Sequence, residues 1–153
     1  MSVKESIFNI LGSALEGNSS GNAPVMLMLG GFKFSLNTIA FQKLERSTAY
    51  RWPSQQRVGN EDAMQFTGPG EDRITIPGVI YPDFRGGLFQ LDILRNVASR
   101  GRPLRLVSSA GAVLGLWVVE SIDEVQSHFK PNGDPLRQEF NIRIRKFSSN
   151  ANI

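Results

Sequence analysis

The residues best suited to chemistry are one histidine and a few carboxylates. His128 is the only histidine, it stands shortly before a turn expected at residues 131–135, and the chain contains no cysteine. Metal ligation needs several suitable groups held together, and the sequence has no HExxH motif and no cysteine pair. We therefore expect His128 to be a solvated residue, neither a catalytic base nor a metal ligand.

The carboxylates stand mostly beside expected turns, where acidic side chains are solvated or bond to the local backbone. Those that matter here are Glu61, Asp62, Glu71, Asp72, Glu120, Asp123, Glu124, Asp134 and Glu139. Glu120 and Asp123 could form an acid–base pair, but nothing in their spacing requires one. No GxSxG nucleophile elbow and no GxxxxGK[ST] phosphate loop is present. The pattern predicts a protein that is not an enzyme and that has no catalytic residues, cofactor or metal.

Arginine lies beside aromatic residues in two segments, Tyr50-Arg51-Trp52 and residues 140–147. Such segments can stack on bases and contact phosphates, and the net charge of +3 agrees with this possibility. In the second segment, however, apolar and basic residues alternate and so fall on opposite faces of a strand. A base-stacking platform needs both kinds of side chain on one exposed face. Nucleic-acid binding therefore remains an alternative to a protein-facing surface, which the pattern favours.

Tryptophan, tyrosine and arginine are the commonest anchors of protein interfaces. On this basis we predict a protein interface, while burial of Tyr50 and Trp52 in the core remains an equal alternative. The predicted interface residues are Tyr50, Arg51, Trp52, Arg57, Arg137, Arg143 and Arg145.

The first elements that would position these residues are a helix and a series of strands. Residues 3–16 carry apolar side chains at three- and four-residue spacing, which predicts an amphipathic helix, and residues 17–22 read as a flexible joint. Together they form an N-terminal helical arm. One buried strand is predicted over 25–36, interrupted by a bulge or kink at its Gly-Gly pair. Further strands are predicted at 41–52, 63–66 and 73–81, with an exposed loop at 54–62 and a turn at 67–70.

The second half of the chain returns once to a helical period. A central helix is predicted over 87–100, ending at the cap glycine Gly101. Residues 104–107 and 112–119 read as a hairpin, and 137–147 as a final alternating strand. The predicted fold class is α+β, a mostly antiparallel β-sheet or β-sandwich with one central helix and an N-terminal amphipathic helical arm.

The length of 153 residues suits one domain that needs neither a metal nor a disulfide to fold. No apolar run approaches the length of a membrane-spanning helix, and the first residues lack the apolar core of a signal peptide. We expect no membrane contact and production in a cytoplasm.

Several motifs, taken in order, resemble one known family. They are residues 26–36, Tyr50-Arg51-Trp52-Pro53 with Arg57-Val58-Gly59, residues 65–72 and 74–78, Gly86-Gly87 with residues 91–95, residues 115–121 and residues 139–146. This ordered set is similar to the phage protein U (GpU) family of tail assembly proteins, which belong to contractile-tailed phages (myoviruses) and related particles such as R-type pyocins. The resemblance spans about residues 25–147.

The resemblance implies a non-enzymatic virion structural protein of a contractile tail. It implies a ripcord-like baseplate component beside the central hub and tube, assembled in the bacterial host cytoplasm. The implied partners are hub, tube, LysM-type and wedge proteins, together with further copies of this chain around the tail axis. A tail terminator or head–tail joining ring is the alternative. The implied organisation is an N-terminal arm and joint at 1–23, the GpU-like domain at 24–148 and a short tail at 149–153.

Overall fold

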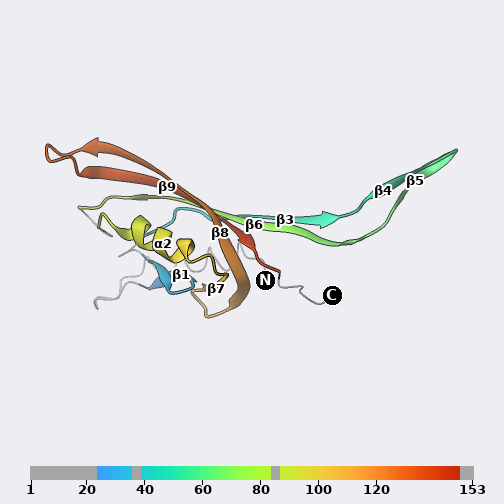
Figure 1. Cartoon of the computed structure of the whole chain (residues 1–153), viewed down its shortest axis with the longest axis horizontal. Coiled ribbons are helices and arrows are strands. Elements are labelled where there is room, and N and C mark those ends of the chain that lie inside the picture. Colours follow the sequence, from blue (N-terminus) through green and yellow to red (C-terminus); the bar gives the residue numbers. More distant parts are fainter. Residues whose placement is uncertain (1–23, 36–38, 84–86, 149–153) are drawn as a thin grey trace.

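The computed structural model describes residues 24–35, 39–83 and 87–148 (Figure 1). The elements are β1 (Val25–Leu29), β2 (Phe32–Ser35), β3 (Glu45–Arg51), β4 (Ser54–Arg57), β5 (Asn60–Met64), β6 (Gly68–Ile80), α2 (Gln90–Ser99), β7 (Leu104–Ser108), β8 (Val113–Phe129) and β9 (Pro135–Lys146). Seven strands form an antiparallel sheet in the order β2-β1-β7-β8-β9-β6-β3. Strands β4 and β5 pair only with each other.

Strand β9 is the centre of the long part of the sheet, because it pairs with both β8 and β6. Ile142 lies between Ile122 of β8 and Ile76 of β6. Phe140, Ile142 and Ile144 are buried, and the residues between them face outward. The alternation predicted for the final strand is therefore confirmed, since successive side chains of a strand point to opposite faces.

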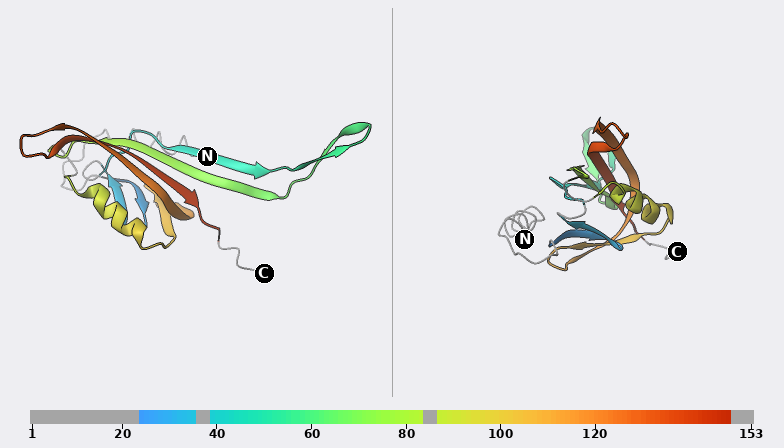
Figure 2. Two further views of the ribbon diagram at one scale, coloured as in Figure 1. Left: turned by 45° about the horizontal axis from the view of Figure 1, so that its top comes forward. Right: turned by 90° about the vertical axis from the view of Figure 1, so that its left-hand side faces the viewer.

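The core lies between the long strands and a smaller layer formed by β1, β2, β7 and α2. Figure 2 shows the short strands and the helix on the same side of the long strands. Leu91 and Leu94 bury one face of α2, and the largest fully buried side chain is Trp117 of β8. The indole Nε1–H of Trp117 donates a 3.1 Å hydrogen bond to the carbonyl of Leu114, so burying this polar group leaves no donor unsatisfied.

Gly78 of β6 provides the space for one large core side chain. It stands opposite Phe140 of β9, and a Cβ atom at this position would lie 2.7 Å from Cε1 of Phe140 and 2.9 Å from the carbonyl oxygen of Ala40. Real side chains do not approach so closely, so the ring packs where only a glycine leaves room.

The predicted α+β class is wrong. The part of the chain that the structure describes is dominated by one antiparallel sheet, and its only helix is the ten-residue α2. The physical reason is that β6 continues through residues 68–70, where a turn was expected, and that the segment expected to be a loop at 54–62 adds strand pairing instead. The predicted N-terminal helical arm falls on residues 1–23, outside the described residues. None of the described helices is long and apolar enough to cross a membrane.

Two local predictions between β3 and β6 are also wrong. The predicted loop at 54–62 forms the strands β4 and β5, and the chain reverses between Arg57 and Asn60. Gly59 at this reversal has φ +74°, a value that glycine adopts without strain. The predicted turn at 67–70 instead belongs to the start of β6, which pairs with β3 from Gly68 onward.

Candidate protein interface on the projecting hairpin

The chain from Tyr50 to Pro69 forms a two-stranded extension, which we call the projecting hairpin. It comprises the end of β3, strands β4 and β5, and the start of β6. In Figure 1 it extends from the sheet on the side opposite the β8–β9 turn. An isolated two-stranded hairpin is marginally stable in water, so this element depends on support at its root and on whatever covers it.

The root of the projecting hairpin is held by an ion pair between neighbouring strands. Arg46 of β3 donates hydrogen bonds of 2.9 and 2.5 Å to the two carboxylate oxygens of Asp72 of β6, and the Thr48 hydroxyl donates a third of 3.2 Å. The hydrogen bond from Arg46 lowers the pKa of the Asp72 carboxyl below its ordinary value, and the same bond raises the pKa of Arg46. Asp72 is therefore an ionised structural group rather than a catalytic acid.

Backbone hydrogen bonds define which side chains face each other along the projecting hairpin. The amide of Thr67 donates to the carbonyl of Arg51 at 3.0 Å, and the amide of Gln65 donates to that of Pro53 at 3.2 Å. Trp52 and Phe66 therefore lie directly opposite each other, and their ring centres are 5.0 Å apart. Cross-strand aromatic pairs of this kind stabilise a hairpin.

One face of the projecting hairpin is apolar. Alternation along each strand places Tyr50 and Trp52 on the same face, and the pairing of Ser54 with Met64 adds Met64 beside Phe66. This apolar face consists of Tyr50, Trp52, Met64 and Phe66, which are between 48% and 63% exposed. Arg46 and Thr48 lie at alternate positions of β3 before Tyr50, so they share its face. The apolar face is therefore the continuation of the inner face of the sheet beyond the end of the core.

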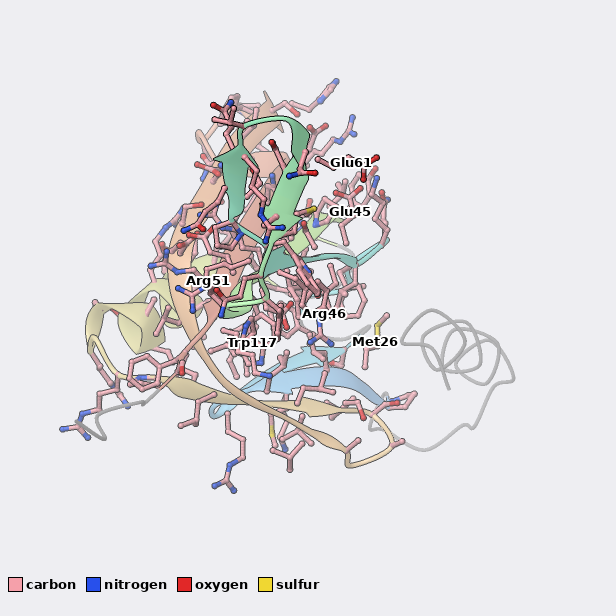
Figure 3. All side chains as sticks on the ribbon, turned by 90° about the vertical axis from the view of Figure 1, so that its right-hand side faces the viewer. Met26, Glu45, Arg46, Arg51, Glu61 and Trp117 are labelled. Carbon is pink, nitrogen blue, oxygen red and sulfur yellow. The ribbon has the colours of Figure 1, made fainter. Side chains whose placement is uncertain are left out.

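The other face of the projecting hairpin is polar. Arg51, Arg57 and Glu61 lie on it or at its edge, and none of them forms an ion pair among the described residues. Figure 3 looks from the side of the hairpin tip and shows Glu61 of β5 apart from Trp117 of β8 in this view.

The predicted interface residues separate into two groups. Tyr50, Arg51, Trp52 and Arg57 lie together on the projecting hairpin, whereas the arginines at 137, 143 and 145 lie on the outer face of β9. There Arg145 pairs with Glu120 at 3.0 Å and with Glu71 at 3.5 Å, and Arg137 pairs with Glu139 at 2.6 Å. Carboxylates of the same molecule thus already pair with Arg137 and Arg145 on the outer face.

Sequence reasoning missed Met64 and Phe66 as members of the apolar face. Both lie in the predicted strand at 63–66, but the turn was placed after them instead of at residues 58–59. Because the chain reverses at Gly59, Trp52 and Phe66, which stand equally far from Gly59 in the sequence, lie opposite each other. A search for aromatic residues symmetric about each candidate turn would have found the pair.

Two further titratable residues, Arg95 and His128, lie away from the projecting hairpin. Arg95 of α2 donates to Glu124 at 2.7 Å and to Asp92 at 2.9 Å, and the bond to Glu124 raises the pKa of Arg95. His128 is exposed at the end of β8. No cluster of three or more His, Cys, Asp or Glu side chains that suits a metal occurs within residues 24–35, 39–83 and 87–148.

Comparison with known families gives a match over most of the chain. The family model described as Phage P2 GpU matches residues 30–149. The chain is also 26% identical over 121 residues to a probable tape measure protein of Halomonas phage phiHAP-1. That alignment covers 78% of this chain, but the chain spans only 14% of the length of the curated relative.

Solved structures with a similar fold come from tails. The SPP1 Dit protein, described as a paradigm of the hub adsorption apparatus, has a TM-score of 0.59 and 8% identity over 79% of this chain and 49% of its own. A chain in the tail of a gene transfer agent particle, refined with C6 symmetry, has a TM-score of 0.53 and 13% identity over 85% of this chain and 96% of its own. At these identities the likeness shows a shared fold.

Proposed function

This chain belongs to the phage P2 GpU family, and on that premise we propose that it is a baseplate component of a contractile tail, beside the central hub and tube. Membership of the family makes the chain a structural component of a phage tail. Its position within the tail and its individual partners are the proposed part. The hub, tube, LysM-type and wedge proteins are the proposed neighbours, and the protein acts by contact rather than by catalysis.

The observation that carries this function is the uncovered apolar face of the projecting hairpin. Four large apolar side chains stand on an extension that has no core of its own, and two of them, Trp52 and Phe66, form a tilted aromatic pair. Exposed apolar surface of this kind marks sites where another protein binds. A tail subunit needs such surfaces because its function is the contact itself.

The similar proteins support a position near the hub. One is described as part of a hub adsorption apparatus and another as part of a tail with six-fold symmetry. The curated relative is a tape measure protein, which is again a tail protein. These descriptions belong to those proteins, and they make a location near the tube axis the leading candidate for this chain.

The projecting hairpin provides the first test. The double variant Arg51→Ala, Trp52→Ala should keep its core folded, because both side chains lie outside the core, yet it should reduce the yield of finished tails severely. Ile93→Ala on α2, which truncates another half-exposed apolar residue, is the matched control and should assemble like the wild type. Normal tails from the double variant would remove the projecting hairpin from the interface.

Location is tested separately by immuno-electron microscopy of intact particles. Labelling should occur at the baseplate end of the tail. Labelling confined to the neck would indicate a terminator or head–tail joining ring instead. Absence of the polypeptide from finished tails would contradict the structural role altogether.

A further inference from the structure

We propose that two copies of the free chain pair through the exposed edge of β3, antiparallel to each other, around a two-fold axis that passes beside Thr48. The contact joins the two seven-stranded sheets into one continuous sheet. Two-fold dimers, in which both copies use the same surface, are the commonest closed assemblies of identical chains. The inference goes beyond the tail function and does not depend on it.

Strand β3 forms one edge of the sheet. Among the described residues it pairs only with β6, along whose outer side it runs in Figure 2. All seven residues of β3 are exposed. Such an edge presents a row of unpaired N–H and C=O groups, which can pair with a strand of another chain. The strand at the opposite edge, β2, has only four residues, so β3 is the longer of the two edges.

Alternation along β3 identifies the backbone groups at the free edge. Arg51 directs its carbonyl toward the returning strand of its own hairpin, because that carbonyl accepts a 3.0 Å hydrogen bond from the amide of Thr67. Successive residues of an antiparallel strand direct their backbone groups to opposite edges. Arg46, Thr48 and Tyr50 therefore direct their N–H and C=O groups outward, away from β6.

No proline or lysine interrupts this edge. Both residues commonly protect edge strands against pairing, and β3 contains neither. Pro53, which follows β3, would direct its missing N–H toward its own hairpin, because its carbonyl accepts a hydrogen bond from the amide of Gln65. The outward donors of β3 are therefore intact.

The charges of β3 favour a second copy as the occupant of the edge. Antiparallel pairing centred on Thr48 places Glu45 directly opposite Arg51 of the second copy, and the symmetry forms this pair twice. Among the described residues Arg51 has no ion-pair partner, and Glu45 pairs only with the exposed Lys43. Opposite charges directly across two strands stabilise their pairing. Each copy therefore supplies the charge that the other lacks.

The inner face of β3 matches as well. At the axis Thr48 lies beside Thr48 of the second copy, and Arg46 lies beside Tyr50 on either side of it. Threonine pairs and cation–aromatic pairs both stabilise neighbouring strands. One step further, Leu44, which packs against the core, lies beside the half-exposed Trp52 of the second copy. The contact therefore covers apolar surface in addition to forming ion pairs.

Other alignments of the two strands lose this agreement. Moving the centre by one residue toward the C-terminus places Glu45 opposite Pro53. Moving it by one residue toward the N-terminus places Arg51 opposite Lys43, which sets like charges together. Parallel pairing in register would place Glu45 beside Glu45, and like charges directly opposite each other are destabilising. The alignment centred on Thr48 is therefore the favoured one.

Charge reversal tests the contact. Sedimentation of the purified full chain should show a dimer. Glu45→Arg alone or Arg51→Glu alone sets like charges opposite each other at both ends of the contact, and each should weaken dimerisation by about tenfold or more. The double variant Glu45→Arg, Arg51→Glu restores opposite charges and should dimerise like the wild type. Arg57→Glu, the same change at an arginine outside β3, is the matched control and should leave the dimer intact.

The remaining outcomes of this experiment contradict the proposal. A wild-type chain that stays monomeric at every concentration overturns it, and so does a dimer that neither single reversal weakens. Single reversals that weaken the dimer without recovery in the double variant exclude the pairing of Glu45 with Arg51. Equal weakening by Arg57→Glu would assign the effect to net charge instead of to this contact.

Disulfide formation tests the alignment independently, because the chain has no natural cysteine. In the proposed dimer Ser47 lies directly opposite Ala49 of the second copy, close enough for a disulfide. An equimolar mixture of Ser47→Cys and Ala49→Cys should therefore give disulfide-linked heterodimers under oxidising conditions, whereas each variant alone should give none. Linked homodimers of either variant alone would show that the strands pair in a different alignment. Absence of any linked dimer would contradict contact through β3.

Discussion

The guanidinium carbon of Arg46 lies 5.6 Å from the centre of the Trp117 ring, so a cation at the root of the projecting hairpin contacts the largest fully buried side chain of the core (Figure 3). The same guanidinium holds Asp72 on the neighbouring strand. Cation–π contact and the ion pair act together on one side chain, which is only 28% exposed. Arg46 therefore links the root of the projecting hairpin to the core.

Removing this contact should loosen the projecting hairpin. Arg46→Ala leaves the nearly buried carboxylate of Asp72 with only the Thr48 hydroxyl, and we expect a loss of about 2 kcal/mol in the free energy of unfolding. Urea unfolding measures it, and hydrogen exchange should quicken at the amides of Gln65 and Thr67. Lys43→Ala removes an exposed pair with Glu45 and should cost less than about 0.5 kcal/mol. Equal effects of the two variants would contradict the role of Arg46.

The ion pair also predicts a dependence on pH. The pKa of Asp72 is lowered in the folded protein from an ordinary value of 3.8, so its contribution to stability is fully present above that value. It is lost as the pH falls from there through the lower pKa of the folded state. The difference in unfolding free energy between the wild type and Asp72→Asn should therefore be largest near neutral pH and shrink in acid. A difference that stays constant from pH 7 down to about pH 2 would exclude this linkage.

Gly78 and Phe140 should behave as a coupled pair. Gly78→Ala places a methyl group against the Phe140 ring and should destabilise the fold by about 1–3 kcal/mol. Phe140→Leu frees part of that space, so the double variant should lose less than the sum of the two single variants. Gly31→Ala, where a Cβ atom would meet nothing within 4 Å, should be close to neutral. Strict additivity in thermal unfolding would show that the two positions do not share this space.

Fluorescence can follow the projecting hairpin, because the chain has only two tryptophans. Trp117 is fully buried and Trp52 is 53% exposed. In Trp117→Phe, the emission should come from Trp52 alone, with a red-shifted maximum and ready quenching by acrylamide. Incorporation into tails should shift that emission to the blue and protect it from quenching. Quenching that is unchanged by assembly would show that the apolar face stays in water.

Local patterns in the sequence were sufficient for much of the sheet. The alternation at residues 137–147 predicted β9 and its buried face, and the turn residues at 108–111 predicted the β7–β8 hairpin. These features depend on neighbours in the chain, since the side-chain period of a strand and the shape of a tight turn are local properties. The family resemblance also came from local sequence motifs, and the match to the family model confirmed it.

The path of residues 50–70 could not be read in this way. Gly68-Pro69-Gly70 has the stronger composition for a turn, yet it pairs with β3. A bulge accompanies this pairing, since three residue steps of β6 from Pro69 to Asp72 stand against two steps of β3 from Thr48 to Tyr50. The chain reverses instead at Val58 and Gly59, where the local signal is weaker. Only pairing between strands decides between the two positions.

The amino-acid sequence alone determined that this protein has strands with one apolar face, few groups able to react, and arginine beside aromatic residues. Only the tertiary structure decided that Tyr50 and Trp52 face water, because the core ends at the ion pair of Arg46 with Asp72 while the strands continue beyond it. Where a core ends depends on which distant layers cover the sheet. No local pattern contains that information.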